Sequence, residues 1–181
     1  MNLKMLFSLM AVAVIAGCAS GPKRDVYSDR GAFRPGIDLI MQNELDSGAK
    51  PTELIWLNAS RIHQGPWDAT YYLEVRYEAL PQTGWLGLGP GETLELTVDG
   101  ETIRFSGMGG LSERTQTSAG TFLEHALYEA SPDSLRKIAR AREVKVDIKG
   151  RTRTIHREFN EANTEQFRTF VLNYLGYRTS P

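Results

Sequence analysis

The chain has 181 residues, of which 41% are hydrophobic and 24% charged, and its formal net charge is -1 at pH 7. This composition is that of a folded globular protein, which excludes a disordered or fibrous chain. The near-neutral charge also argues against nucleic acid as a partner, because nucleic-acid-binding domains carry a basic excess. A single cysteine, Cys18, excludes a disulfide within the chain.

The chain begins with a short basic start followed by an apolar run. Lys4 precedes Met5–Ile15, which is apolar apart from Ser8, and the small pair Ala16-Gly17 comes directly before Cys18. The run is too short to span a bilayer, which takes about 20 apolar residues. Its layout is typical of a secretory signal with a cleavage site after small residues.

The tetrad Ile15-Ala16-Gly17-Cys18 resembles the lipobox of bacterial lipoproteins, with Ile in place of the commoner Leu. The resemblance covers the first 18 residues. It implies a signal peptide over residues 1–17 and a lipid on Cys18, where several acyl chains would give stable membrane anchoring. Ala19 after the cysteine is similar to lipoproteins that Gram-negative bacteria sort to the outer membrane. The domain would then face the periplasm.

Removal of the signal leaves 164 residues (181 − 17), enough for one domain. Residues 18–50 contain several Gly and Pro residues, which predicts a tether. Within it, the helical spacing of Ile37, Ile40, Met41 and Leu45 predicts a short helix after Pro35. Residues 51–181 are expected to form a single globular domain.

Three patterns in the middle of the chain predict strands. Glu53–Asn58 is β-rich and apolar, typical of a strand buried on both faces, and a turn is expected at Gln64–Pro66. Tyr71–Tyr77 alternates between apolar and polar residues. Thr93–Phe105 alternates in the same way on both sides of Asp99-Gly100, a dipeptide suited to a tight hairpin turn.

The next part of the chain predicts a loop followed by the first helix. Gly107–Gly120 is rich in Gly, Ser and Thr, which indicates a long loop. Phe122–Ala130 fits either a helix or a strand, and we favour a strand. Ser131-Pro132 is a helix start, because the hydroxyl can cap free amides and Pro is tolerated in the first turn.

The last part predicts a second hairpin and a second helix. Val144–Ile148 and Thr152–Phe159 read as strands around the turn Lys149–Arg151. Asn163–Gln166 resembles a capping box, and Gly176 is expected to end the helix. The helix carries an apolar stripe made of Phe167, Phe170, Val171, Tyr174 and Leu175.

Short turns between neighbouring strands, with helices late in the chain, predict an α+β fold. We expect an antiparallel sheet of about six to seven strands, with the two helices of the C-terminal half packed on one face. The domain has a general similarity to uncharacterised bacterial envelope lipoproteins, a group that implies no particular activity.

Few residues point to catalysis. Ser134-x-x-Lys137 matches a motif of serine enzymes that act on peptidoglycan, but its companion motifs are missing and the segment fits an ordinary helix face. His63, His125 and His156 are scattered without metal-ligand spacing. We therefore predict no catalytic residue, no metal and no cofactor.

Two features are candidate interaction sites. The first is a local basic excess that would suit phospholipid, lipopolysaccharide or an acidic envelope protein, although a solvated hairpin is the commoner reason for such a pattern. Its main residues are Arg142, Lys145, Lys149, Arg151, Arg153 and Arg157. Arg153 and Arg157 fall on the same face of their strand as the apolar residues Ile155 and Phe159. This pattern suggests an edge strand, where charged side chains prevent pairing with a strand of another molecule.

The second feature is an apolar loop, Trp85-Leu86-Gly87-Leu88, which is either an exposed binding tip or, more commonly, a lid folded onto the core. Together these features favour a lipid-anchored envelope protein with an interaction or structural role. The alternative is an envelope hydrolase or transferase that acts on peptidoglycan or lipid through an unrecognised site.

Overall fold

The computed structural model describes residues 37–46, 52–63, 69–108 and 113–175. The described chain forms ten strands and two helices. In chain order these are β1 (Ile37–Ile40), β2 (Glu44–Leu45), β3 (Glu53–His63), β4 (Ala69–Ala79), β5 (Gly91–Val98), β6 (Glu101–Gly107), β7 (Glu113–Gln116), β8 (Phe122–Glu129), α1 (Pro132–Arg140), β9 (Val144–Lys149), β10 (Thr154–Glu158) and α2 (Glu161–Tyr174). The fold is α+β, as predicted.

All ten strands belong to one antiparallel sheet with the order β1-β3-β4-β8-β6-β5-β9-β10. The short strand β2 pairs with β3, and β7 pairs with β8. The prediction of about six to seven strands is therefore wrong. The missed strands β1, β2 and β7 have four residues or fewer, which is too short for a period-two pattern to appear.

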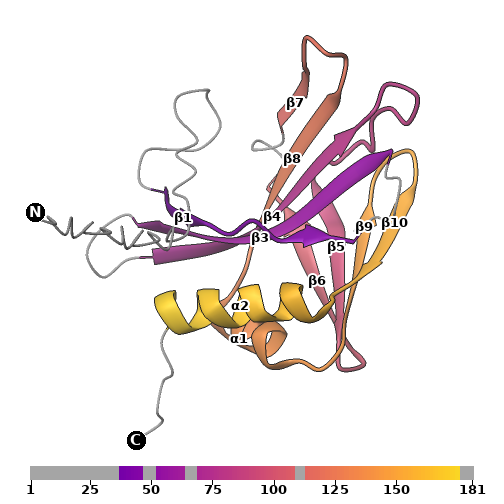
Figure 1. Cartoon of the computed structure of the whole chain (residues 1–181). Helices are drawn as coiled ribbons and strands as arrows, with labels where there is room; N and C mark the ends of the chain where they lie inside the picture. Colours follow the sequence, from indigo (N-terminus) through magenta and orange to yellow (C-terminus); the bar gives the residue numbers. More distant parts are fainter. Residues whose placement is uncertain (1–36, 47–51, 64–68, 109–112, 176–181) are drawn as a thin grey trace, which may run out of the picture.

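The sheet is strongly curled, and α1 and α2 lie together below it in Figure 1. Arg153 and Arg157, at the β10 end of the strand order, both donate hydrogen bonds to Glu53 at the start of β3. Because β10 and β3 are not neighbours in the sheet, these bonds bring the two end regions of the sheet together across its inner face.

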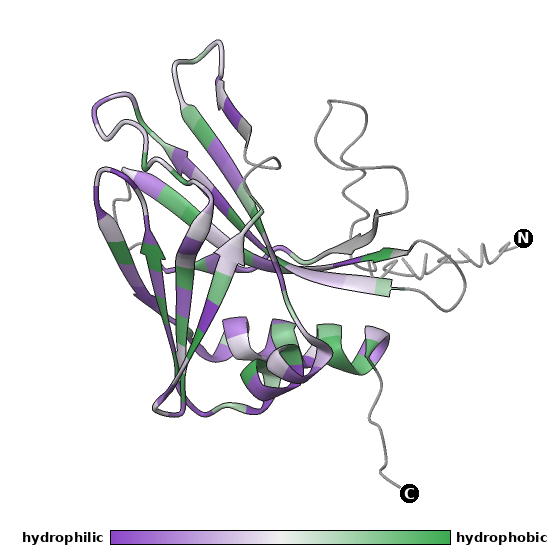
Figure 2. Cartoon of the chain, turned by 180° about the vertical axis from the view of Figure 1, so that it is seen from behind, coloured by the Kyte–Doolittle hydropathy of each residue, from purple (hydrophilic) through white to green (hydrophobic). Residues whose placement is uncertain are grey.

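The inner face of the curled sheet holds the core. Strands alternate between hydrophobic and hydrophilic residues, as Figure 2 shows. The inner side chains of β3, β4, β5 and β9 are fully buried, among them Leu57, Val75, Leu96 and Val146. Helix α2 adds Phe167, Phe170 and Val171 of its predicted stripe to this core, while Tyr174 and Leu175 are half-buried against it.

Several predicted elements are confirmed. Phe122–Glu129 is a strand, and the β5–β6 hairpin turns at Asp99 (φ 48°) and Gly100 (φ 87°). Helix α1 begins after Ser131, whose Oγ accepts from the Ser134 backbone N–H at 3.0 Å. Strand β10 is an edge of the sheet, as the charge pattern suggested.

The predicted helix after Pro35 is wrong, because this segment forms β1 and β2. The 11-residue strand β3 offers a long edge, and the backbone of the segment continues along it between the two short strands. The Met41 N–H donates to the Ala59 carbonyl, and the Leu57 N–H donates to the Asn43 carbonyl. The sheet thus includes residues that the sequence assigned to the tether.

Two further predictions need correction. The loop predicted over Gly107–Gly120 contains β7, which pairs with β8 through a turn closed by hydrogen bonds between Thr117 and Thr121. Helix α2 begins earlier than predicted, since its cap is Asn160 and the reciprocal capping box joins Asn160 to Asn163. An Asn at the third helical position supplies the oxygen that Glu or Gln usually supplies.

Some predictions fall outside the described residues. These are the signal peptide, Cys18, the turn at Gln64–Pro66 and the helix end at Gly176.

Candidate functional site

The loop that carries Trp85 connects β4 to β5 and folds inward. Leu86 and Leu88 are 0% and 1% exposed and belong to the core. Trp85 is half-buried, and its ring lies 4.5 Å from that of Phe122 at the start of β8. The apolar loop is therefore mainly a lid on the core, and only its Trp85 side chain lies partly at the surface.

A buried carboxylate on β8 holds the backbone of this loop. Glu124 on β8 is fully buried and accepts hydrogen bonds from the backbone N–H groups of Leu86 (2.5 Å), Gly87 (2.9 Å) and Leu88 (2.8 Å). Successive N–H groups that converge in this way form an anion-binding concavity, here filled by the protein's own carboxylate. Arg114 on β7 adds a bond from Nε to Glu124 (3.2 Å) and one from Nη2 to the Leu88 carbonyl (2.6 Å).

The turn between β9 and β10 packs directly on the same loop. The Arg151 N–H donates to the Gly87 carbonyl, and the Thr152 N–H donates to the Leu86 carbonyl, both at 3.2 Å. The Thr152 hydroxyl donates to the Trp85 carbonyl at 3.1 Å. At Gly150 a Cβ would lie 2.3 Å from the Leu86 carbonyl oxygen, so only glycine allows this approach. The structure thus brings the two predicted interaction features together.

Several cations of the predicted basic surface bind carboxylates within the fold. Arg153 donates to Glu53 and to the Tyr77 hydroxyl (2.9 Å), and Arg157 donates to Glu53 (3.0 Å) and to the His156 carbonyl (2.9 Å). Burial raises the pKa of Tyr77, and the Arg153 guanidinium beside it opposes that rise. These two arginines hold the sheet ends together.

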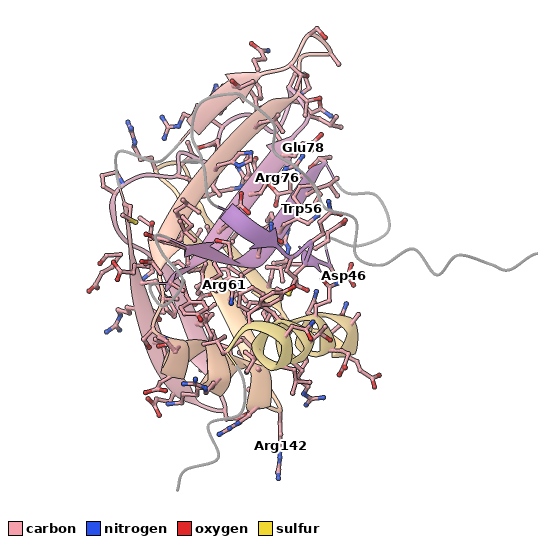
Figure 3. The ribbon with its side chains drawn as sticks, turned by 90° about the vertical axis from the view of Figure 1, so that its left-hand side faces the viewer. Asp46, Trp56, Arg61, Arg76, Glu78 and Arg142 are labelled. Atoms are coloured by element: carbon pink, nitrogen blue, oxygen red, sulfur yellow. The ribbon has the colours of Figure 1, made fainter. Side chains whose placement is uncertain are left out.

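The remaining cations of the predicted surface are dispersed. Lys145 pairs with Glu143 at 2.8 Å and Lys149 pairs with Glu95 at 3.1 Å. The hydrogen bond to Glu143 raises the pKa of Lys145. Arg142 points away from the domain near the helices (Figure 3).

Arg151 is exposed beside the Trp85 loop. The six predicted residues therefore do not form one continuous basic strip.

We use the name tip surface for Leu80, Trp85, Phe122 and Arg151. Leu80 is 42% exposed and directly follows β4, whose last residue, Ala79, is the strand partner of the β8 residue Phe122. The β4–β5 loop and the β9–β10 turn, which carry Trp85 and Arg151, lie at the end of the sheet opposite the two helices (Figure 1). The tip surface combines one exposed leucine and two half-buried aromatic rings with the exposed Arg151.

The outer face of the central strands carries a polar network that sequence reasoning missed. Glu74 on β4 is fully buried and accepts from Asn58 Nδ2 at 3.0 Å, while His125 Nδ1 lies 3.3 Å from its other oxygen. The Asn43 N–H donates to Asn58 Oδ1 at 2.9 Å, which fixes the orientation of that amide. The polar residues at alternate positions of Tyr71–Tyr77 were the sequence pattern from which this network could have been predicted.

The same outer face carries a half-buried stack next to this network. The Arg76 guanidinium lies 4.8 Å from the Trp56 ring centre and 3.6 Å from the Glu78 carboxylate, and Figure 3 shows the three side chains close together. Arg76 and Trp56 are direct register partners on β4 and β3.

An open groove of about 840 Å³ runs along the outer side of β9 and β10. Its lining includes Thr97, Lys145, Asp147, His156, Glu158 and Phe159. His156 Nδ1 lies 2.6 Å from Asp147 Oδ1, and the two residues are direct cross-strand partners. Neither the groove nor this pair was predicted, because the neighbours across strands are set by register and not by sequence spacing.

The predicted catalytic motif has a structural explanation. The Ser134 hydroxyl lies 2.8 Å from that of Ser131, the cap residue, and Lys137 pairs with Glu101 on β6. Within the described ranges, no three His, Cys, Asp or Glu residues are placed to hold a metal ion. None of the described helices has the length and apolar character needed to cross a membrane.

Comparison of the chain with family models, with curated proteins and with solved structures gives no match.

Proposed function

We propose that this chain is a lipid-anchored protein of the bacterial cell envelope whose domain contacts an anionic membrane surface through the tip surface. The observation that carries the proposal is the joining of the Trp85 loop and the β9–β10 turn by hydrogen bonds, in which Arg151 is bonded to Gly87 and Thr152 to Trp85, so that both residues belong to one joined pair of loops. The role is interaction and not catalysis.

The anchor in this proposal is Cys18, on the strength of the lipobox-like tetrad that precedes it. Diacylglycerol on the sulfur and a fatty acid on the amine would fix the chain to the membrane, and Ala19 supports the outer membrane as its destination. The segment between Cys18 and β1 then tethers the domain. Cys18→Ser tests this part: the wild type should incorporate labelled palmitate in cells, and the variant should not. Equal labelling of both would remove the anchor from the proposal.

The tip surface has the chemistry of a membrane-interface contact. Tryptophan is enriched at membrane–water interfaces, where its ring is partly apolar and its N–H stays in the polar layer. A cation next to an anionic bilayer contributes about 1 kcal/mol. Such a contact is weak by itself, but a tether raises the local concentration of the membrane, so a weak contact suffices.

Rigid support makes the contact more favourable. Glu124 holds the loop backbone, and the β9–β10 turn is bonded to the loop, so the side chains at the surface are displayed on a fixed frame. Pre-organisation of this kind lowers the entropy that binding must remove.

Vesicle flotation tests the membrane contact. The chain without residues 1–18 should float with vesicles that contain anionic phospholipid at low salt, and should float less with neutral vesicles. Arg151→Glu should reduce flotation severalfold, because it replaces attraction by repulsion at the surface. Arg142→Glu is the matched control, since it makes the same change of charge at the other end of β9, where the Arg142 N–H donates to Asp99. Equal flotation of the two variants would overturn the proposed contact.

A further inference from the structure

The open groove along β9 and β10 lies apart from the tip surface and has different chemistry. Two rows of outer-face residues run across the strands in register: Thr97 opposite Lys145 opposite Glu158, and Asp147 opposite His156. The residues that follow β10 continue the wall with Phe159. The groove is therefore a polar trough with an aromatic side chain at one end.

The charges of the groove are nearly balanced. Carboxylates are supplied by Asp46, Asp147 and Glu158, and cationic side chains by Lys145 and Arg157, with His156 beside Asp147. Both permanent cations also bind carboxylates outside the groove, since Lys145 pairs with Glu143 and Arg157 with Glu53. A strongly anionic ligand would meet the groove carboxylates, and a strongly cationic one would meet Lys145 and Arg157.

Three polar side chains of the groove are held in place by partners. His156 is fixed by Asp147, Arg157 by Glu53, and the Asn160 side chain by the N–H of Asn163 in the capping box of α2. A surface whose donors and acceptors are already oriented loses less side-chain entropy when a ligand binds. Phe159 is the one hydrophobic residue among the described residues that line the groove, and it is half-buried against the core.

We propose that this groove binds a polyhydroxylated chain, that is, an oligosaccharide segment of an envelope glycan. Each sugar hydroxyl both donates and accepts a hydrogen bond, which matches a lining where carboxylates and nitrogen donors alternate. Phe159, whose ring packs against that of Phe167, lies half-buried at one end of the groove, where the groove meets the core. An open trough, unlike a closed pocket, accepts a few units of a longer polymer. About 840 Å³ lies within the usual range of ligand sites, roughly 300–1,000 Å³.

Two sources of such a chain exist in an envelope, the glycan strands of peptidoglycan and the sugars of lipopolysaccharide. The test uses the full lipidated protein in detergent micelles, with purified peptidoglycan sacculi in one arm and lipopolysaccharide in the other. Soluble oligomers of β-1,4-linked N-acetylglucosamine serve as competitors. The wild type should sediment with at least one of the two glycans, and the arm that does so identifies the source.

The double variant His156→Ala with Glu158→Gln should weaken this binding at least tenfold, because both side chains are exposed in the groove. The matched control is Thr154→Ala, an exposed position on the same strand that does not line the groove. Far-ultraviolet circular dichroism and melting temperature should be unchanged in both. No sedimentation with either glycan, or equal binding by the double variant and the control, would overturn the inference. Binding that is lost with Arg151→Glu but kept by the double variant would assign the contact to the tip surface and overturn it as well.

Discussion

Arg151 and Arg153 lie two residues apart in the same basic segment, yet they belong to two different regions of the molecule. Arg153 faces inward, where it donates to Glu53 and Tyr77 and joins the end of the sheet to β3. Arg151 remains exposed, and its backbone N–H donates to the Gly87 carbonyl of the Trp85 loop. The difference shows that neighbouring cations can have different roles. A cation that lies where the two ends of the sheet meet is bound within the fold, and one beyond that point stays exposed.

The inward region resembles a small ion-pair network. Burial by itself would lower the pKa of Arg153, but the hydrogen bonds to Tyr77 and Glu53 outweigh that effect and raise it, so the guanidinium stays charged. The Arg153 guanidinium carbon also lies 5.7 Å from the centre of the Tyr77 ring, which adds a cation–π interaction. The rigidity of the outward region comes from Glu124 beneath the loop, which accepts from the loop N–H groups and pairs with Arg114.

The largest expected effect follows from removal of that support. Glu124→Ala should lower the free energy of unfolding by about 3–5 kcal/mol, because it leaves Arg114 and three buried N–H groups without their acceptor. Urea unfolding measures the change. Glu129→Ala, at an exposed position of the same strand, is the control and should change stability little. Equal effects would mean that Glu124 does not hold the loop.

A smaller effect on stability is expected to distinguish Arg153 from Arg151. Arg153→Ala should cost about 1.5–3 kcal/mol, the usual range for a hydrogen bond to a charged group, since Glu53 and Tyr77 lose a donor. Arg151→Ala should leave the melting temperature within the error of the wild type. Thermal unfolding of both variants at one pH checks this. A destabilised Arg151→Ala protein would show that the outward region is structural too.

The smallest effect is a pH dependence that belongs to the inward region. Because the folded state raises the pKa of Tyr77, its contribution to stability is fully present below the ordinary tyrosine value of about 10 and is lost as pH rises through the folded pKa. Stability should therefore fall in strongly alkaline solution, and Tyr77→Phe should reduce that fall. Chemical denaturation from pH 8 to about pH 11 measures it. An alkaline slope identical in both proteins would contradict this role of Tyr77.

Local sequence patterns were sufficient for many elements of this fold. Alternation predicted the β5–β6 hairpin, and Ser131-Pro132 predicted the start of α1, because both signals are local. The strand order could not be predicted from the sequence, since β8 lies between β4 and β6 in the sheet and no local pattern encodes that pairing. β1 was mistaken for a helix because pairing with β3 overrode its helical spacing.

The sites were harder to predict than the elements. The sequence predicts the Trp85 loop and the basic segment as separate candidate interaction sites. Their contact could not be predicted, because it depends on tertiary structure and on the close approach that Gly150 allows. One unused signal was Glu124 itself, which occupies the core-facing parity of β8 together with Ala126 and Tyr128. A lone carboxylate on an apolar strand face must be paired inside the fold, and that requirement points to a buried anchor.

In the proposed function the tip surface meets the membrane, and the fluorescence of Trp85 reports on that contact. The chain has three tryptophans, so Trp56→Phe with Trp67→Phe leaves Trp85 as the reporter. This lipidated variant is reconstituted into vesicles with anionic phospholipids whose acyl chains carry bromine, a contact quencher. We predict a blue-shifted emission that bromine quenches at low salt, and recovery of the emission at high salt or with Arg151→Glu. An emission that is unquenched and unshifted in anionic vesicles would contradict the account.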